Sequence, residues 1–189
     1  MKTKTMKIAF AGGLLSAAFL LVGLTSQTVY GQNNAPFGGK DDTAFAAKLW
    51  AEMTKARLVG AKSINTHPYK GQAPHGAILQ TVDTSITVDG RDARVIVKKN
   101  FGPGSVTVKD VWRDPNKHLK AVTVMFKRKD GYDKDNANWF WAKYLANGSL
   151  DKNPKGMMLA GRVAKGADQG CIACHSAAGG KDYLFINDE

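Results

Sequence analysis

Cysteine is scarce in this chain, because only two of its 189 residues are cysteines. Two cysteines cannot build the framework of several disulfides that stabilises many small exported domains. They are also too few for a four-cysteine zinc site, and His67, His75 and His118 are a poor source of the missing ligands. The chain further lacks the βαβ pattern in which thioredoxin-type cysteine pairs occur. Disulfide scaffolds, zinc sites and dithiol redox centres are therefore disfavoured.

The two cysteines that are present lie near the end of the chain, in the sequence Cys171-Ile172-Ala173-Cys174-His175. Two cysteines separated by two residues and followed at once by histidine are the attachment signature of c-type haem. Each thiol adds to one vinyl group of the haem, and the histidine that follows is the proximal ligand of the iron. The spacing predicts one covalent haem c held by Cys171 and Cys174, with His175 on the iron.

The N-terminus has the pattern of an export signal. Three lysines precede an apolar run over Ile8–Leu24, and small residues end the segment at Gly31. The run is slightly short for a membrane span, so we expect residues 1–31 to be a cleaved signal peptide. Residues 32–41, rich in Asn, Gly and Pro, predict a flexible start. Export fits haem c, which is attached outside the bacterial inner membrane, and it predicts a periplasmic protein.

Basic residues outnumber acidic ones, and the formal net charge is +11. The expected cleavage removes three of the 27 basic residues and none of the 16 acidic ones, which leaves 158 residues with a net charge of +8. No basic block interleaved with aromatic residues is present, which disfavours nucleic acid as a partner. The lysines are scattered and predict solvated surfaces, with acidic redox partners as a weaker alternative.

The hydrophobic pattern predicts a single α+β domain over residues 42–189, with an antiparallel sheet packed against a few helices. Phe45, Leu49 and Met53 recur at helical spacing, with Asp41, Asp42 or Thr43 as the cap and Gly60 as the stop. Period-two or apolar runs joined by short turns predict strands. The predicted strands are 77–82, 85–88, 94–98, 105–112 and 121–127, and the aromatic run 139–144 is expected in the core or in a strand that includes a wall of the haem pocket.

A haem motif at the end of the chain is unlike the small electron-transfer cytochromes, in which it comes first. Bundle cytochromes also carry it late, but their helical periodicity is absent from Val95–Trp112. The chain resembles the cytochrome P-460 family in the order and spacing of several short segments between Thr43 and Phe185. These segments are 74–76 (PHG), 104–109 (GSVTVK), 122–127 (VTVMFK), 131–133 (GYD), 138–144 (NWFWAKY) and 171–175 (CIACH).

The resemblance implies an antiparallel sheet with helices, an open distal side of the haem, and a homodimer. In the name-giving members a lysine is bonded to a haem meso carbon, and the enzyme oxidises hydroxylamine to nitrogen oxides such as NO or N2O, passing electrons to an external cytochrome. Lys109 stands where that lysine is expected, although an ordinary solvated lysine fits the position equally well. In the relatives called cytochrome c-prime-beta this bond is absent, and the haem binds nitric oxide or carbon monoxide.

Several roles in the site remain open at this level. A six-coordinate electron carrier is a third alternative, with His75, His67 or a methionine at 157 or 158 as the sixth iron ligand, and His75 is the best of these. An enzyme would need a proton acceptor near the iron, whereas an apolar pocket around the iron would favour the binding of nitric oxide or carbon monoxide. The expected acceptors are Asp110, Asp133 and Asp135, and the expected lining residues are Phe101, Phe126 and Phe140.

Overall fold

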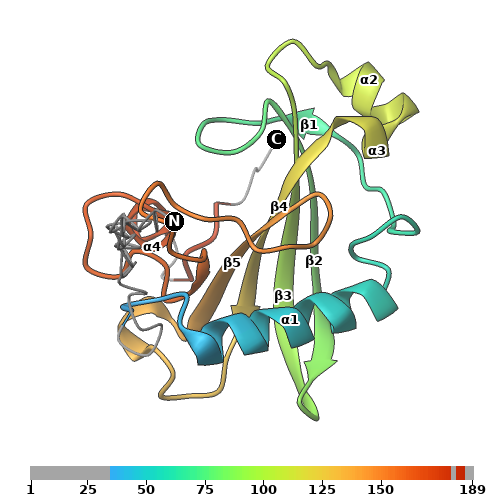
Figure 1. Cartoon of the computed structure of the whole chain (residues 1–189). Helices are drawn as coiled ribbons and strands as arrows, with labels where there is room; N and C mark the ends of the chain where they lie inside the picture. Colours follow the sequence, from blue (N-terminus) through green and yellow to red (C-terminus); the bar gives the residue numbers. More distant parts are fainter. Residues whose placement is uncertain (1–34, 180–181, 186–189) are drawn as a thin grey trace, which may run out of the picture. The chain divides into compact units, whose positions relative to one another are not determined.

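The computed structural model describes residues 35–179 and 182–185 of the protein (Figure 1). The chain divides into two units, Met1–Tyr30 and Gly31–Glu189, and every described residue belongs to the second. The expected signal peptide, residues 1–31, therefore lies outside the described residues, as do the first residues of the expected flexible segment, 32–34. Within the described part of the chain, no helix is both long and apolar enough to cross a membrane.

In the described residues, strands that follow one another in the sequence pair to form a single antiparallel sheet in the order β1 to β6. The strands are β1 (Tyr69–Lys70), β2 (Ile78–Val88), β3 (Arg91–Phe101), β4 (Leu119–Lys127), β5 (Trp139–Leu145) and β6 (Ala160–Gly161). The helices are α1 (Lys40–Lys55), α2 (Val108–Arg113), α3 (Pro115–His118), the short 3-10 helix η1 (Lys134–Asn136) and α4 (Cys171–His175). The predicted α+β class is confirmed.

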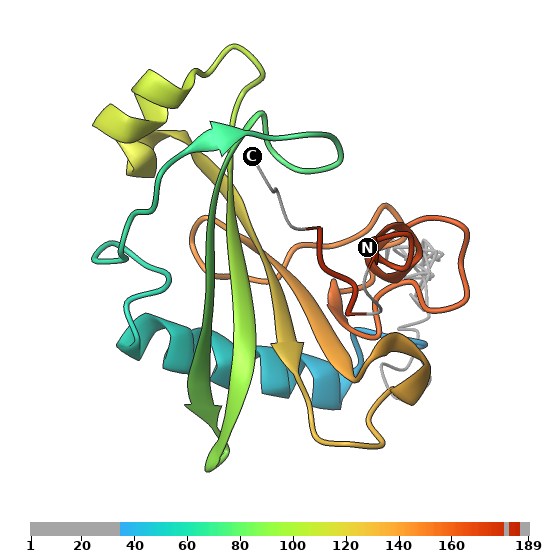
Figure 2. The ribbon, with the colours of Figure 1, turned by 180° about the vertical axis from the view of Figure 1, so that it is seen from behind.

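The two longest strands of the sheet, β2 and β3, form a hairpin (Figure 2). Asp89 and Gly90 make its turn with φ values of 50° and 75°. Positive φ at both central residues is what a two-residue type I′ turn requires, and glycine adopts it without strain. The sequence predicted a break between residues 82 and 85, but β2 is continuous there because every residue from Ile78 to Val88 pairs with β3.

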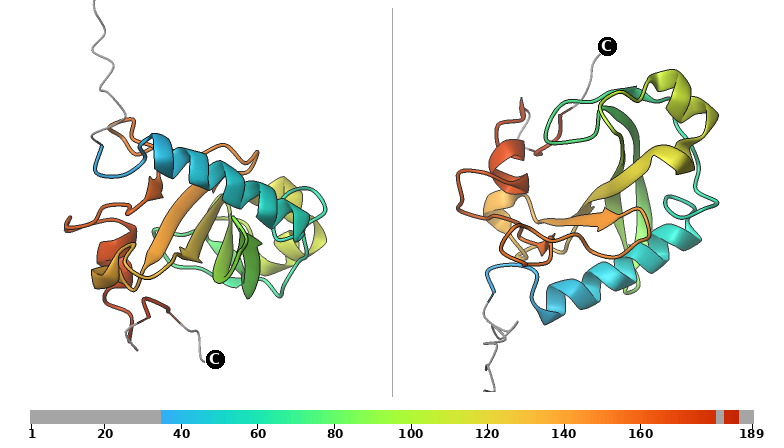
Figure 3. Two further views of the ribbon diagram at one scale, coloured as in Figure 1. Left: turned by 90° about the horizontal axis from the view of Figure 1, so that it is seen from below. Right: turned by 45° about the horizontal axis from the view of Figure 1, so that its top comes forward.

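One face of the sheet packs against α1, which crosses the strands in Figures 1 and 3. Leu49 and Met53 of α1 are fully buried, and the Tyr144 hydroxyl donates a hydrogen bond to the carbonyl of Ala46 (2.9 Å). The sheet contributes alternate residues to this core, as the two-residue period of a strand requires. They include Val95 and Val97 of β3, Val122, Val124 and Phe126 of β4, and Phe140, Ala142 and Tyr144 of β5.

The first helix is confirmed, but the prediction of its cap is wrong. The cap residue is Gly39, and α1 already includes Lys40 and Asp41, which the sequence placed in a flexible segment. Asp42 instead accepts a hydrogen bond from the backbone N–H of Gly38 (3.0 Å), and Gly38 also donates to the carbonyl of Ala160 (2.8 Å). The first bond ties Gly38 to α1, and the second fastens the start of the described chain to β6.

The predicted strand at 105–112 is wrong, because its second half is helix α2. Thr107 and Asp110 form a capping box: the Thr107 hydroxyl accepts from the Asp110 N–H (3.2 Å), and Asp110 accepts from the Thr107 N–H (3.0 Å). This arrangement satisfies two backbone donors at a helix start. Val111 is fully buried one helical turn after Val108, so the apolar residues also fit a helical period.

The opposite face of the sheet holds a second, smaller apolar cluster. Ile96 of β3, Met125 of β4 and Trp141 of β5 point to this face, because they alternate with the residues that pack against α1. Ile172 of α4 packs on them, and so do the half-buried side chains of Tyr183 and Leu184. The haem-attachment helix therefore lies on the face that α1 does not cover (Figure 3).

Replacement of Leu49 by alanine should reduce the free energy of unfolding by about 2–5 kcal/mol, because it leaves a cavity under a fully buried side chain of α1. Lys55→Ala is the matched control on the same helix, and it should change stability by less than about 0.5 kcal/mol, because Lys55 is exposed. Urea unfolding of the mature protein measures both. Equal losses in the two variants would contradict the packing described for α1.

Candidate haem-attachment site

Helix α4 brings the two thiols and the imidazole of the motif together in about one turn. Cys171 is half-buried and Cys174 is exposed, and both are free cysteines. Because they are three residues apart in a helix, they lie on the same side of it. The cap residue Gly170 has a φ of 126°, and a Cβ there would lie 2.4 Å from the Cβ of Ala164, so only glycine fits this start.

The His175 ring is fixed by the last described segment of the chain. Its Nδ1 lies 2.7 Å from the carbonyl oxygen of Tyr183. A carbonyl can only accept, so Nδ1 carries the proton and Nε2 keeps its lone pair. Burial lowers the pKa of His175, the Tyr183 bond opposes this, and the charge of Lys98 adds to the lowering. The ring is thus held as a neutral imidazole with Nε2 free, which is the form that binds a metal ion.

The surroundings of His175 suit a flat apolar group attached through sulfur. The ring centroids of Trp141 and Phe185 lie 4.9 and 5.4 Å from that of His175. Burial raises the pKa of the Cys171 thiol to about 11, so this sulfur is kept uncharged, as it also is in a thioether. The indole N–H of Trp141 is buried and has no hydrogen-bond partner in the described structure. An unsatisfied buried donor beside the motif fits the edge of a haem.

His75 reaches the same region from the loop before β2. Its ring centroid lies 6.2 Å from that of His175, with the two planes at 89°. Nδ1 of His75 is 3.1 Å from the side-chain oxygen of Asn100, which leaves Nε2 of this ring free as well. A Cβ at Gly76 would lie 2.6 Å from backbone atoms of Phe101, so glycine lets the loop pack directly on β3 and place His75 there.

Lys98 also lies on this face, and the sequence analysis missed it. It alternates with Lys99, which is buried on the other face and donates from Nζ to the Ser63 hydroxyl (2.7 Å) and the Ile64 carbonyl (2.6 Å). Burial lowers the pKa of Lys98, and no carboxylate in the described part of the chain offsets this. Its charge lowers the pKa of both His75 and His175, which places the amine near both rings.

Comparison with known protein families identified a match to this chain. The model of the family Cytochrome P460 matches residues 51–186, which is more than half of the chain. The chain belongs to the cytochrome P460 family. Comparisons with curated proteins and with solved structures found no match. Membership establishes a haem cytochrome, in agreement with the resemblance on which the sequence analysis relied.

Lys109, predicted from the sequence as the cross-linked lysine of a P460-type haem, lies on α2 and not on a strand. Its side chain is exposed and borders a hollow of about 550 Å³ that Lys70, Ile78 and Val106 also line. Helices α2 and α4 lie well apart in each of the ribbon views (Figures 1–3). The displacement follows from the capping box at Thr107, which turns the chain into a helix after the sheet has ended.

The phenylalanines expected to line the pocket face elsewhere. Phe126 and Phe140 belong to the core under α1, and Phe101 packs with Ile78 and Val111. Strand alternation explains this, because their neighbours Met125 and Trp141 take the face of α4. The aromatic run 139–144 forms strand β5, as expected, and its Trp141 lies beside His175. That this run forms a wall of the haem pocket stays a prediction.

The three expected proton acceptors have other partners. Asp110 caps α2, while Asp133 is fully buried and accepts from Asn136 and from Lys165, which also contacts Asp135. Among the other expected iron ligands, His67 is exposed beside Trp112, with ring centroids 5.8 Å apart, and Met157 packs against the cluster that contains Ile172. Of the residues proposed for the distal side, the structure brings only His75 beside His175.

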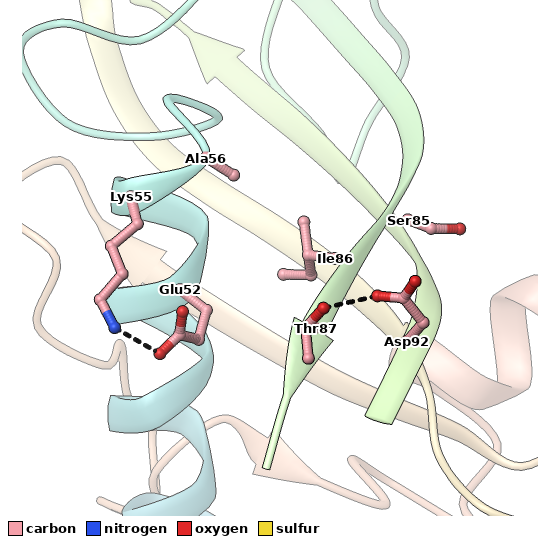
Figure 4. A pocket seen from close by; sticks show the side chains of 7 residues that line it. All are labelled: Glu52, Lys55, Ala56, Ser85, Ile86, Thr87 and Asp92. Carbon is pink, nitrogen blue, oxygen red and sulfur yellow. Dashed lines mark hydrogen bonds and ion pairs between the residues drawn. The ribbon is translucent and has the colours of Figure 1, made fainter. Parts of the chain in front are cut away.

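A second hollow, of about 400 Å³, lies between the end of α1 and the β2–β3 hairpin (Figure 4). Each of its charged residues already has a polar partner. Lys55 donates to Glu52 (2.7 Å) and Thr87 donates to Asp92 (2.6 Å), as the dashed lines in Figure 4 mark. This hollow is lined by residues of α1 and the hairpin and contains none of the haem motif.

Acidification should destabilise the protein through His75. Burial, aided by the charge of Lys98, lowers the pKa of His75 from 6.5 to about 4, so between these values the unfolded chain binds a proton that the folded chain does not. Stability is then fully present above pH 6.5 and is lost as the pH falls toward 4. Urea unfolding should show that the free energy of unfolding of His75→Gln falls less between pH 6.5 and 4 than that of the wild type. Between pH 7 and 8, titration of His75 should change the free energy of unfolding of neither protein. Identical acid losses would contradict the buried, neutral state of His75.

Proposed function

We propose that the protein binds a single haem c through thioether bonds to Cys171 and Cys174, with His175 Nε2 on the iron. The observation that carries this proposal is the hydrogen bond from His175 Nδ1 to the Tyr183 carbonyl. This bond keeps the ring neutral and leaves Nε2 free, beside the two free thiols. Membership of the cytochrome P460 family supports it. The haem would supply the redox centre, and the protein residues around it would control access and protons.

The reaction that we propose is the oxidation of a small nitrogen species, with hydroxylamine giving NO or N2O. Oxidation of hydroxylamine to NO releases one proton and one electron for every hydrogen removed, so the site needs proton acceptors and an external electron-transfer cytochrome as oxidant. His75 is the residue best placed to accept protons, because its Nε2 is free and its ring centroid lies 6.2 Å from that of His175. Lys98 lies on the same face of the sheet, and its charge contributes to the lowered pKa of His75.

One observation favours a second candidate, a six-coordinate electron carrier. The rings of His75 and His175 are close, perpendicular and both free at Nε2, which is also an arrangement suited to two axial ligands. Binding of nitric oxide or carbon monoxide without turnover, as in cytochrome c-prime-beta, is the third candidate. It is less well supported, because Phe101, Phe126 and Phe140 pack away from the face that carries α4.

For cellular context we keep the expectations from the sequence. We propose that the mature protein is periplasmic, as the signal-like residues 1–31 and the chemistry of haem c attachment favour. We also propose a homodimer, on the resemblance alone. The surplus of basic residues suits an acidic redox partner, and we propose no role in binding nucleic acid.

Replacement of His75 by glutamine tests the proposed reaction. If His75 accepts protons, hydroxylamine oxidation by the mature holoprotein, with an oxidised cytochrome as acceptor, should fall by roughly a hundredfold, while the spectrum of the iron stays high-spin. His67→Gln is the control, because His67 is exposed and lies beside Trp112. A wild-type spectrum that is low-spin and becomes high-spin in His75→Gln would establish the carrier. No turnover by the wild type would contradict the enzyme.

A covalent bond from a lysine to a haem meso carbon is the family feature that remains to be located. We favour Lys98 over Lys109, because Lys98 is half-buried near His175, whereas Lys109 is exposed on α2. Such a bond replaces one N–H and one C–H bond by an N–C bond, so an oxidant such as a peroxide must take the lost hydrogens. Its formation would shift the Soret band far to the red.

The pair Lys98→Arg and Lys109→Arg locates the bond. We expect tryptic digests of the wild type to contain a haem peptide that includes residue 98. This peptide and the red-shifted Soret band should be lost in Lys98→Arg and retained in Lys109→Arg. The reverse pattern would establish Lys109 as the linked residue. An unshifted Soret band and no lysine-linked haem peptide in the wild type would show that the bond does not form in this protein.

A further inference from the structure

The segment after α4 returns to the sheet and is anchored at Asp182 by three strands. The Asp182 carboxylate accepts from Arg94 of β3 (3.0 Å) and from Lys127 of β4 (2.7 Å). Its backbone carbonyl accepts from the indole N–H of Trp139 of β5 (3.0 Å). These contacts join residues far apart in the sequence, and together they hold Asp182 against β3, β4 and β5.

The next residue, Tyr183, connects this anchor to His175. Its hydroxyl lies 2.9 Å from the carbonyl of Asp135 and 3.1 Å from the side-chain oxygen of Asn136. Its own carbonyl accepts the hydrogen bond from His175 Nδ1 (2.7 Å). The φ of Tyr183 is 62°, a left-handed conformation that costs a non-glycine residue energy and persists only where the surroundings hold it.

The part of the chain that receives the Tyr183 hydroxyl is itself rigidly held. Asn136 is buried and donates from Nδ2 to the Asp133 carboxylate (2.9 Å). The Asp133 side chain is completely buried and is paired with Lys165. The Asn138 side-chain oxygen accepts from the Asp133 backbone N–H (2.9 Å), which closes the loop on itself. Tyr183 is therefore fixed at its hydroxyl by a buried polar network and at its carbonyl by the proximal histidine.

We propose that Asp182 and Tyr183, here called the tail clamp, are positioning residues that set the orientation and the donor strength of His175 toward the haem iron. When one nitrogen of an imidazole binds a metal, a hydrogen bond from the other nitrogen to a carbonyl orients the ring. The same bond makes the ring a stronger electron donor to the metal. A stronger donor favours ferric over ferrous iron. The tail clamp therefore lowers the reduction potential of the haem. This inference rests on ligation of the haem by His175 and is independent of the nitrogen chemistry.

Two substitutions weaken the tail clamp in different ways. Asp182→Asn removes the charge that binds Arg94 and Lys127, whereas Tyr183→Phe removes only the hydroxyl and changes no charge. Both should move the midpoint potential of the mature holoprotein to more positive values, by an amount equivalent to roughly a tenfold change in the ferrous-to-ferric ratio, about 59 mV for one electron. Both should also lower the iron–histidine stretching frequency in resonance Raman spectra of the ferrous protein.

Loss of a negative charge near a haem raises its potential by itself, so Asp182→Asn needs a matched control. Asp83→Asn provides this control. The Asp83 carboxylate also accepts from Arg94, from Nε (2.9 Å) and Nη2 (2.5 Å), but it has no hydrogen bond to Asp182 or Tyr183. We expect Asp83→Asn to leave the iron–histidine frequency unchanged. Asp182→Glu, which retains the charge, should recover most of the wild-type potential.

The decisive comparison is Tyr183→Phe with the wild type, since it involves no change of charge. A wild-type potential together with a wild-type iron–histidine frequency in this variant would overturn the proposal. Equal shifts of the midpoint potential and of the iron–histidine frequency in Asp182→Asn and Asp83→Asn would overturn the positioning role of Asp182. Its effect would then be that of its charge alone. If Asp182→Asn yields no holoprotein, Tyr183→Phe still decides. Failure of hydroxylamine turnover does not affect any of these measurements.

Discussion

The structure depends on the strict alternation of side chains along β3, β4 and β5. On each strand every second residue is used by α1, and the residues between them form the face that carries α4. Val95 and Val97 of β3 are buried under the helix, while Ile96 and Lys98 face the other way. This division gives α1 a continuous apolar core, and it leaves a second apolar surface for the segment that contains α4.

The free face combines apolar surroundings with a few basic groups whose pKa values are lowered by burial. The pKa values of His75, Lys98 and His175 are all lowered, in each case mainly by burial and not by a neighbouring charge. The two histidines are therefore neutral at pH 7, and a neutral imidazole beside a redox centre suits reactions in which protons leave together with electrons. The same burial would make any charged group introduced on this face costly for stability.

Much of this arrangement could be predicted from the sequence, because its signals are local. The haem motif, the helix around Leu49 and the turn at Asp89-Gly90 each depend on residues that are close in the chain. The position of Lys109 was misjudged because an alternating run was given more weight than the Thr107–Asp110 capping box. The phenylalanines were misplaced because the sequence pattern shows that two faces exist, but not which face α4 occupies.

Lys98 and the tail clamp show what sequence patterns could not provide. The Lys98-Lys99 pair already contains one lysine for each face, so alternation would have identified two candidates without separating them. The bonds from Tyr183 to Asp135 and Asn136 join residues almost fifty positions apart, and no local pattern predicts such contacts. Long-range polar contacts of this kind are specified by the packing of the whole domain.

The central claim is that the haem lies against the face of β3 to β5 that carries Lys98 and Trp141. Paramagnetic broadening by ferric haem in NMR spectra of the isotope-labelled mature protein tests this claim most directly. The account predicts that the backbone amide signals of residues 96–98 and 141 are strongly broadened relative to a diamagnetic reference, while those of α2, residues 108–113, stay sharp. Broadening of α2 with sharp signals for residues 96–98 would contradict it.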